Sequence, residues 1–230
     1  MLIVSSLQSG QSTNKLYFNN PNFYSAKAST VDEIALDSYH FNVVNDKLQI
    51  TSDNTQFTID LPTTFVKLKS IQLSYDHQYV AYDLEVTNGT KIYVVNLLTG
   101  EHTNVSDTVG YVYDYSGYEV PYGIAWSPTE NILAFVGGYD GSTRVNIFHF
   151  EHDGSMQSKN GSLAYQRELR GVKWAKDGSS IYFLVESGVA ADKNTLYQTS
   201  IEITDGYMYG DTIEKIKELD QEESDAWLKN

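Results

Sequence analysis

The hydrophobic and polar positions of this chain follow a twelve-residue pattern that occurs three times, at Ile71–Tyr82, Ile124–Phe135 and Val172–Phe183. Each copy begins with a short apolar run that ends in a large apolar side chain, and four polar or turn-forming residues follow. Apolar residues then stand at every second position. The first part predicts a short strand and the middle part a tight turn. The alternation predicts a second strand with one face in the core.

The spacing of the three copies indicates the architecture. Their fourth residues are Ser74, Ser127 and Ala175, so the pattern recurs after 53 and then 48 positions. A four-stranded propeller blade takes roughly 40–50 residues, and a unit that recurs at such a distance usually reports the whole fold. We therefore expect an all-β protein, a β-propeller-like array of about four four-stranded antiparallel blades, as a partial or small propeller.

Two further strands are expected after each copy of the pattern, separated by Gly-, Asn- or Asp-containing turns. The expected third strands are Lys91–Asn96, Arg144–Phe150 and Thr195–Ile203. The expected fourth strands are Glu101–Val105, Ser162–Arg167 and Ile213–Leu219. The last of these also fits one face of a helix, and the blade pattern favours the strand.

Upstream of the repeats the chain predicts one diverged blade. Its short strands are expected at Tyr39–Val44, Lys47–Thr51, Gln56–Leu61 and Phe65–Leu68. The blades then cover residues 31–68, 69–107, 122–167 and 170–219. Residues 1–30, rich in Asn, Ser and Thr, are expected to form an arm or loop, and residues 220–230 an acidic, solvated tail anchored by Trp227.

Composition narrows the choice of partners. The chain has 230 residues, of which 41% are hydrophobic and 20% charged, and this is typical of a globular protein. Its net charge of −14 would repel a phosphate backbone, so we expect no nucleic acid partner. Cysteine is absent, which excludes disulfides and cysteine-bound metals. No apolar run reaches the roughly 18 residues of a membrane span, and no signal peptide is visible. We expect no membrane insertion, and a cytoplasmic location is favoured.

Two of the repeats resemble those of known propellers. Gly123–Gly154 reads GIAWSPTENILAFVGGYDGSTRVNIFHFEHDG, and Arg170–Ser187 reads RGVKWAKDGSSIYFLVES. Both are similar to repeats in the propellers of TolB and of the prolyl-oligopeptidase and dipeptidyl-peptidase families. Ile71–Glu101 resembles the same repeat without its tryptophan. The resemblance implies the propeller fold over about two thirds of the chain.

The sequence departs from those families in two respects. The peptidases carry a hydrolase domain with a Gly-x-Ser-x-Gly motif, which this chain lacks. Their propellers have about six to eight blades, whereas about four are encoded here. We therefore expect the array to close as a small ring or against another chain, because open sheet edges would otherwise remain.

Five tyrosines crowd the connection between the second and third blades, at Tyr111, Tyr113, Tyr115, Tyr118 and Tyr122. The first three alternate, so in an extended segment they present one aromatic face. Tyrosine combines a large rigid ring with a polar tip, which suits protein recognition or sugar stacking. We take these five as candidate partner- or ligand-binding residues. An edge strand whose tyrosines pack on their own blade is the alternative.

Other groupings give no prediction of catalysis or of a cofactor. His149, Glu151 and Asp153 alternate, with His152 beside them, and such residues offer metal ligands in principle. Exposed polar residues ahead of a turn explain the same pattern. The remaining histidines stand apart in the sequence: His40, His77 and His102. We expect no cofactor, no metal and no catalytic residue.

These observations favour a non-enzymatic structural or protein-interaction module, a subunit of a larger assembly that covers its sheet edges. Its partner would be a protein or a second copy of the chain. Two alternatives stay open. One is the propeller domain of a peptidase-like enzyme that lacks its hydrolase domain, and the other is a propeller that binds a glycan through the same tyrosines.

Overall fold

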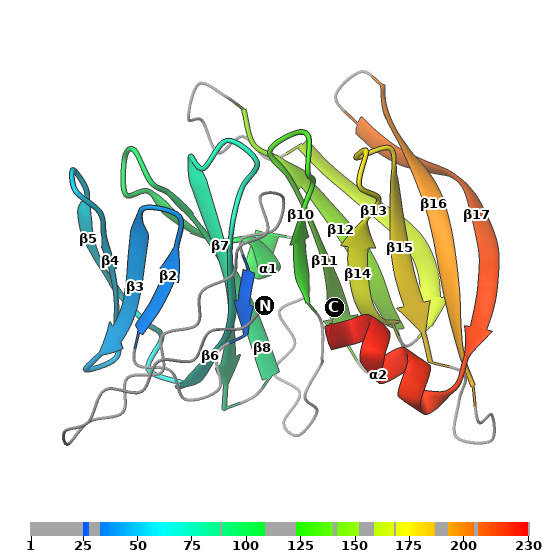
Figure 1. Ribbon diagram of the computed structural model, residues 1–230, viewed down its shortest axis with the longest axis horizontal. Helices are drawn as coiled ribbons and strands as arrows, with labels where there is room; N and C mark the ends of the chain where they lie inside the picture. Colours follow the sequence, from blue (N-terminus) through cyan, green and yellow to red (C-terminus); the bar gives the residue numbers. More distant parts are fainter. Residues whose placement is uncertain are drawn as a thin grey trace.

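Four antiparallel sheets stand side by side in the computed structural model (Figure 1). Within each sheet, neighbouring strands follow one another along the chain, and one additional edge strand joins the second sheet. The structure describes residues 25–27, 33–87, 89–108, 123–139, 142–151, 159–167, 169–186, 193–204 and 207–229. The expected all-β fold of four four-stranded, blade-like sheets is confirmed.

The first sheet consists of β2 (Glu33–Leu36), β3 (Tyr39–Val44), β4 (Lys47–Thr51) and β5 (Gln56–Asp60). One face carries buried apolar side chains at Ile34, Leu36, Phe41, Leu48, Ile50 and Ile59. The other face is half-buried or exposed and mostly polar, with His40, Asn42, Gln49, Thr51, Gln56, Thr58 and Asp60 beside the exposed Val44. The array therefore presents a solvated face at this end.

The second sheet consists of β6 (Phe65–Leu73), β7 (Tyr79–Val86), β8 (Gly89–Asn96) and β9 (His102–Asn104). A short strand, β1 (Ser25–Lys27), pairs with β6 on the side away from β7, within the region expected to be an arm. Helix α1 (Val105–Thr108) follows β9 directly.

One strand expected in the first sheet belongs to the second. The sequence pattern predicts Phe65–Leu68 at the end of the first blade and no strand at the position of β2. In the structure β2 completes the first sheet, and 65–68 continues into β6, which pairs with β7 along its whole length. Register shifts between Phe65 and Lys67 and between Leu68 and Ser70 interrupt the alternation there. Such bulges conceal the continuity of a strand in its sequence.

The third sheet consists of β10 (Ile124–Trp126), β11 (Ile132–Tyr139), β12 (Ser142–His149) and β13 (Lys159–Arg167). The fourth sheet consists of β14 (Leu169–Trp174), β15 (Ser180–Val185), β16 (Asn194–Thr204) and β17 (Tyr207–Leu219). The preferred strand over 213–219 is confirmed by β17. The expected solvated tail is instead helix α2 (Gln221–Lys229), which lies across the lower part of the fourth sheet in Figure 1.

Hydrophobic cores lie between neighbouring sheets. Tyr82 and Leu84 of β7 face the first sheet, whereas Tyr79 and Ala81 of the same strand face the third. Another core between the third and fourth sheets contains Phe183 of β15. A strand buried on both faces reads as a nearly continuous apolar run, and β7 has this character.

The third residue of the twelve-residue pattern connects one sheet to the sheet before it. The indole Nε1 of Trp126 donates to the backbone carbonyl of Gln72 at 3.1 Å, and that of Trp174 donates to the carbonyl of Ala125 at 3.0 Å. Gln72 and Ala125 hold the second position of their own copies. In return, Gln72 Nε2 donates to the carbonyl of Ile124 at 2.8 Å. The pattern thus encodes the junction between blades as well as the strands.

The turns after the first strands also connect neighbouring sheets. His77 Nδ1 lies 3.1 Å from Asp37 Oδ2 in the corresponding turn of the first sheet. Asn131 Nδ2 donates to Asp76 Oδ2 at 2.7 Å, between the second and third sheets. The polar turns of the pattern therefore form a row along one end of the array.

Candidate functional site

The five candidate tyrosines Tyr111, Tyr113, Tyr115, Tyr118 and Tyr122 all lie outside the described residues, and their role stays a prediction. His152 and Asp153 also lie outside them. In the described ranges no group of three or more His, Cys, Asp or Glu side chains is placed to hold a metal ion. Neither helix in this part of the chain is both long and apolar enough to span a bilayer. The candidate site in the described part of the chain therefore consists of other residues.

Three stacked rings lie on one face of the second sheet. They come from Tyr82 of β7, Tyr93 of β8 and His102 of β9, and cross-strand pairing brings them together because Tyr82 lies opposite Tyr93. The Tyr82 and Tyr93 rings are 5.4 Å apart and 15° from parallel. The Tyr93 and His102 rings are 4.7 Å apart and 20° from parallel. Strand register thus makes an aromatic stack from residues that are distant in the sequence.

The deepest ring is hydrogen-bonded to the histidine. Tyr82 is fully buried, and its hydroxyl lies 2.5 Å from Nε2 of His102. Burial, and then the neighbouring Tyr93, raise the pKa of Tyr82 well above its usual value. Burial lowers the pKa of His102. At neutral pH the phenol therefore keeps its proton and the imidazole is neutral, and one hydrogen bond joins the two groups.

Tyr93 is half-buried and joins the ring stack to a polar group. Burial raises its pKa first, the charge of Asp107 raises it further, and a hydrogen bond with Asn104 opposes both effects. Because the phenols of Tyr82 and Tyr93 both stay protonated at neutral pH, neither is prepared to act as a nucleophile or a base.

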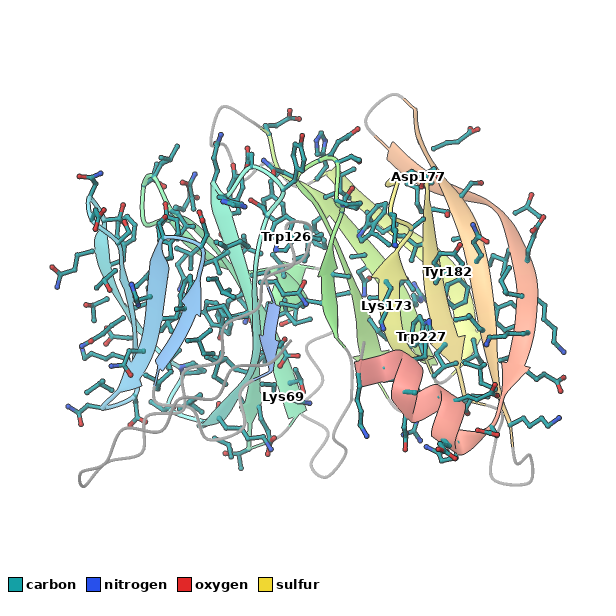
Figure 2. The ribbon with its side chains drawn as sticks, in the orientation of Figure 1. Lys69, Trp126, Lys173, Asp177, Tyr182 and Trp227 are labelled. Atoms are coloured by element: carbon teal, nitrogen blue, oxygen red, sulfur yellow. The ribbon has the colours of Figure 1, made fainter. Side chains whose placement is uncertain are left out.

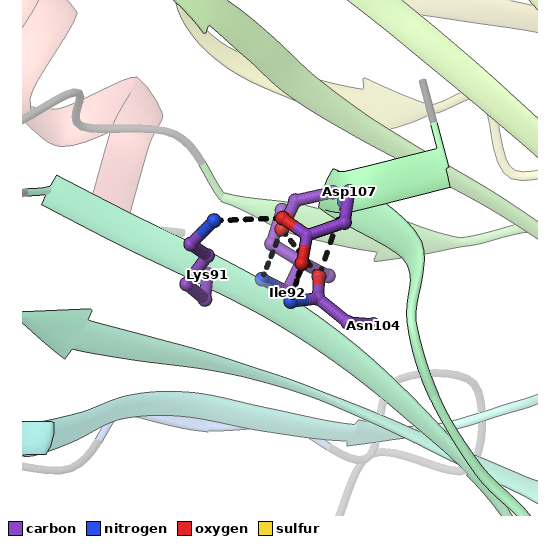
Figure 3. Close-up of polar contacts among 5 residues, drawn as sticks. Lys91, Ile92, Asn104 and Asp107 are labelled. Carbon is purple, nitrogen blue, oxygen red and sulfur yellow. Dashed lines mark hydrogen bonds and ion pairs between the residues drawn. The ribbon is translucent and has the colours of Figure 1, made fainter. Parts of the chain in front are cut away.

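The polar group fastens α1 to β8 (Figure 3). Lys91 Nζ contacts Asp107 Oδ1 at 2.7 Å, and Asn104 Nδ2 donates to Asp107 Oδ2 at 2.8 Å. The backbone N–H of Asp107 donates to Asn104 Oδ1 at 3.2 Å, which makes Asn104 the N-cap of α1. Ser106 Oγ donates to the same amide oxygen at 2.6 Å and accepts from the N–H of Ile92 at 3.3 Å.

We call Lys91, Tyr93, His102, Asn104 and Asp107 the second-sheet patch. All five side chains reach solvent in part, and those of Lys91 and Asp107 are 29% and 44% exposed. The patch offers an aromatic surface, a cation, a carboxylate and an amide within a few ångströms of one another. This chemistry suits recognition of a ligand that has both an apolar and a polar side.

The patch adjoins the tyrosine-rich connection in the sequence. Helix α1 ends at Thr108, and Tyr111 follows three positions later. The sequence does not show the neighbours of His102, because the pairing of three strands determines them. One pattern in the sequence could have indicated the site. Tyr93 lies in an expected third strand and His102 in the expected strand that follows it, so the two could be neighbours across the pair.

No protein-family model matches the chain, and no curated protein matches it. Solved structures of similar shape include that of a prolyl endopeptidase, with a TM-score of 0.49 and 14% identity over 85% of this chain and 29% of that one. An oligogalacturonate lyase in complex with manganese has a TM-score of 0.47 and 13% identity over 84% of this chain and 54% of that one.

A third similar structure is that of a protein described as TolB from Agrobacterium tumefaciens. Its TM-score is 0.45, with 16% identity over 78% of this chain and 58% of that one. The chain thus spans between 29% and 58% of the length of these three proteins. They include both kinds of propeller that the repeats resemble, TolB and the prolyl-oligopeptidase type. The likeness concerns the fold alone, which rests on the four sheets described above.

Proposed function

We propose that this chain is a non-enzymatic protein-interaction module that binds its partner through the second-sheet patch and the adjoining tyrosine-rich connection. The observation that carries the proposal is the parallel pair of Tyr93 and His102, which is partly open to solvent and lies beside the ion pair of Lys91 and Asp107. Tyrosine is enriched among the residues that contribute most to protein interfaces, because a rigid ring buries a large area at a small entropic cost.

The charges of the patch support recognition more than reaction. The carboxylate of Asp107 is engaged by Lys91 and Asn104, and the imidazole of His102 is engaged by a protonated phenol. A partner that meets such satisfied groups gains orientation from them and affinity from the rings. The sequence suggested an assembly that covers open sheet edges. The outer face of the first sheet is mostly polar, and α2 covers the outer face of the fourth sheet. Because neither end of the array is an open apolar surface, a surface patch is favoured as the binding element.

A carbohydrate is the second candidate partner. The stacked rings of Tyr93 and His102 stand next to the amide of Asn104 and the carboxylate of Asp107, so a sugar ring could stack while its hydroxyls bind these groups. A glycan array separates this candidate from the first. Binding that is lost with Tyr93→Ala would favour the carbohydrate.

The test of the main proposal uses Tyr93→Ala and Asp107→Lys, with Tyr75→Ala as the control. Tyr75 is 54% exposed and lies in the turn between β6 and β7, away from the patch. Proteins captured by the wild type are compared quantitatively with those captured by each variant, after thermal melts have shown that all are folded. A partner retained by Tyr75→Ala and reduced at least tenfold by both patch variants supports the proposal, whereas equal capture by all four proteins contradicts it.

A serine-hydrolase activity probe tests the enzymatic alternative. We expect no labelling of the folded chain above that of a heat-denatured sample. Specific labelling that a competing inhibitor removes would replace the non-enzymatic proposal with a hydrolase.

A further inference from the structure

Helix α2 covers the outer face of the fourth sheet, where a following blade would pack. Its Trp227 and Leu228 side chains lie against an apolar group made by Tyr182, Leu184, Leu196 and Leu219 of the sheet. Figure 2 shows Trp227 close to Lys173 and Tyr182 on this face. This group corresponds to the cores that the other sheets share with their neighbours.

One polar contact of α2 repeats the chemistry of a junction between blades. Lys173 holds the second position of its copy of the twelve-residue pattern, as Gln72 does in the first copy. Gln72 donates from its side chain to the carbonyl of Ile124 in the next sheet. Lys173 Nζ donates to the carbonyl of Trp227 in α2 and also lies 4.5 Å from the centre of the Trp227 ring. Helix α2 therefore receives a side-chain contact like the one that the third sheet receives from Gln72.

The sheet provides space for the helix at Gly171. A Cβ atom at this position would lie 2.6 Å from Cδ2 of Leu228 and 3.3 Å from Cζ3 of Trp227. The corresponding residue in the third sheet, Gly123, would have nothing within 4 Å of such a Cβ. A side chain at 171 would thus compete with α2 for the same surface.

A capping box stabilises the start of the helix, and one buried hydrogen bond joins the helix to the sheet. Asp220 and Glu223 form a capping box, in which Asp220 Oδ1 accepts from the N–H of Glu223 at 2.8 Å and Glu223 Oε2 accepts from the N–H of Asp220 at 3.1 Å. Ser224 Oγ accepts from Asn194 Nδ2 at 2.9 Å, and both residues are buried. The apolar face is thus closed by a structured element.

We propose that this outer face of the fourth sheet is a blade-docking surface that α2 occupies, and that the partner it fits is the same face of a second copy of this chain. A two-fold dimer pairs identical faces, so the group around Leu184 and Leu196 would meet its own copy. The opposite end of the array is a poor match, because the outer face of the first sheet is mostly polar and Val44 is its one exposed large apolar side chain among the described residues. While α2 is docked, it competes with the second copy for the surface.

The experiment displaces α2 in the full chain from two sides. Leu228→Glu places a charge on the helix face that meets the sheet, and Gly171→Phe fills the space of Leu228 from the sheet. Lys229→Gln is the matched control, because it changes the charge by the same amount on an exposed position of α2. Molar mass is measured by light scattering after size exclusion over a tenfold range of concentration.

We expect the control to have a mass near 25.9 kDa, and both displacing variants to approach twice this mass as concentration rises. A peptide of residues 220–230, added in excess, should return Leu228→Glu to the monomer. Displacing variants that stay monomeric with a wild-type circular dichroism spectrum would overturn the proposal. So would aggregates that the peptide does not dissolve, or a control that dimerises as strongly as the variants. None of these results depends on the second-sheet patch, which Tyr93→Ala tests separately.

Discussion

The indole of Trp174 donates a hydrogen bond of 3.0 Å to the backbone carbonyl of Ala125, across the boundary between the third and fourth sheets. The equivalent bond from Trp126 reaches the carbonyl of Gln72 one boundary earlier. Tryptophan suits this position because it fills the core and still carries one donor at the far end of its ring. The tryptophans of the repeat are therefore junction residues as well as core residues.

Replacement of Trp174 by phenylalanine tests this role. The substitution keeps an aromatic ring and removes the donor, so a buried carbonyl loses a partner and a small space opens beside it. We expect the free energy of unfolding to fall by about 2 kcal/mol. Urea denaturation measures it, with an unchanged m-value as the sign that the folded state is otherwise intact. Tyr75→Phe, at an exposed position, should change stability by less than about 0.5 kcal/mol. Equal effects of the two variants would refute the junction role.

The turn contact between the second and third sheets predicts an effect of pH. Asn131 is buried and donates to Asp76 at 2.7 Å. Asn131→Asp would put two carboxyl groups at this distance, which raises the pKa of the pair in the folded state. We expect a loss of about 2–3 kcal/mol near neutral pH.

The sign of this pH effect follows from linkage. The folded pKa of the variant pair lies above the unfolded one, so the repulsion is present at high pH and is relieved as the pH falls through the folded pKa. The deficit of Asn131→Asp relative to the wild type should therefore shrink as the pH is lowered from about 7 to about 4. Asn131→Ala is the control and should show little narrowing. A deficit of Asn131→Asp that is constant with pH would contradict the expectation.

The fold was predictable from sequence where local pattern and long-range packing agree. The twelve-residue copies contain their own turns and alternate with period two, so their strands follow from the residues alone. β6 was divided incorrectly because bulges near Lys67 and Leu68 interrupt its alternation. The acidic sequence of α2 predicts a solvated tail, whereas the stability of the helix depends on contacts with Lys173 and Asn194, which lie far away in the chain.

The candidate site was less accessible to sequence reasoning. The stack of Tyr82, Tyr93 and His102 depends on the register of three strands, and a shift of one residue would turn a side chain to the other face. The expected strands contained these residues, but sequence alone does not fix the register.

The histidine of the stack gives a second pH prediction. The pKa of His102 is lowered from its usual 6.5 by burial. The unfolded chain then binds the proton more readily, so the stability that a neutral His102 contributes is fully present above about pH 6.5 and is lost as the pH falls toward the folded pKa. His102→Gln stays neutral throughout. We expect the wild type to lose more stability than this variant between about pH 7 and pH 5, measured by urea denaturation at each pH. Parallel pH profiles would show that His102 is not the titrating group.

A glycine in the turn between β14 and β15 gives the fourth prediction. Gly178 has a φ of +73°, and a Cβ atom there would lie 2.2 Å from Oγ1 of Thr129 in the third sheet. Gly178→Ala should cost about 2 kcal/mol, from backbone strain and from the collision together. The double variant with Thr129→Ala should recover the part due to the collision and keep the part due to strain, so the two changes should not be additive in thermal melts. Strict additivity would exclude the contact.

The junctions between sheets have a further consequence. The second position of the pattern offers a backbone carbonyl, and the third position of the next copy offers an indole. Neither Gln72 nor Ala125 needs a particular side chain to accept the bond, because the acceptor belongs to the main chain. A tryptophan at the third position of a copy can therefore make this bond with whichever copy comes before it. Gain or loss of a whole unit by duplication or deletion would leave this indole-to-carbonyl bond available at the new junction.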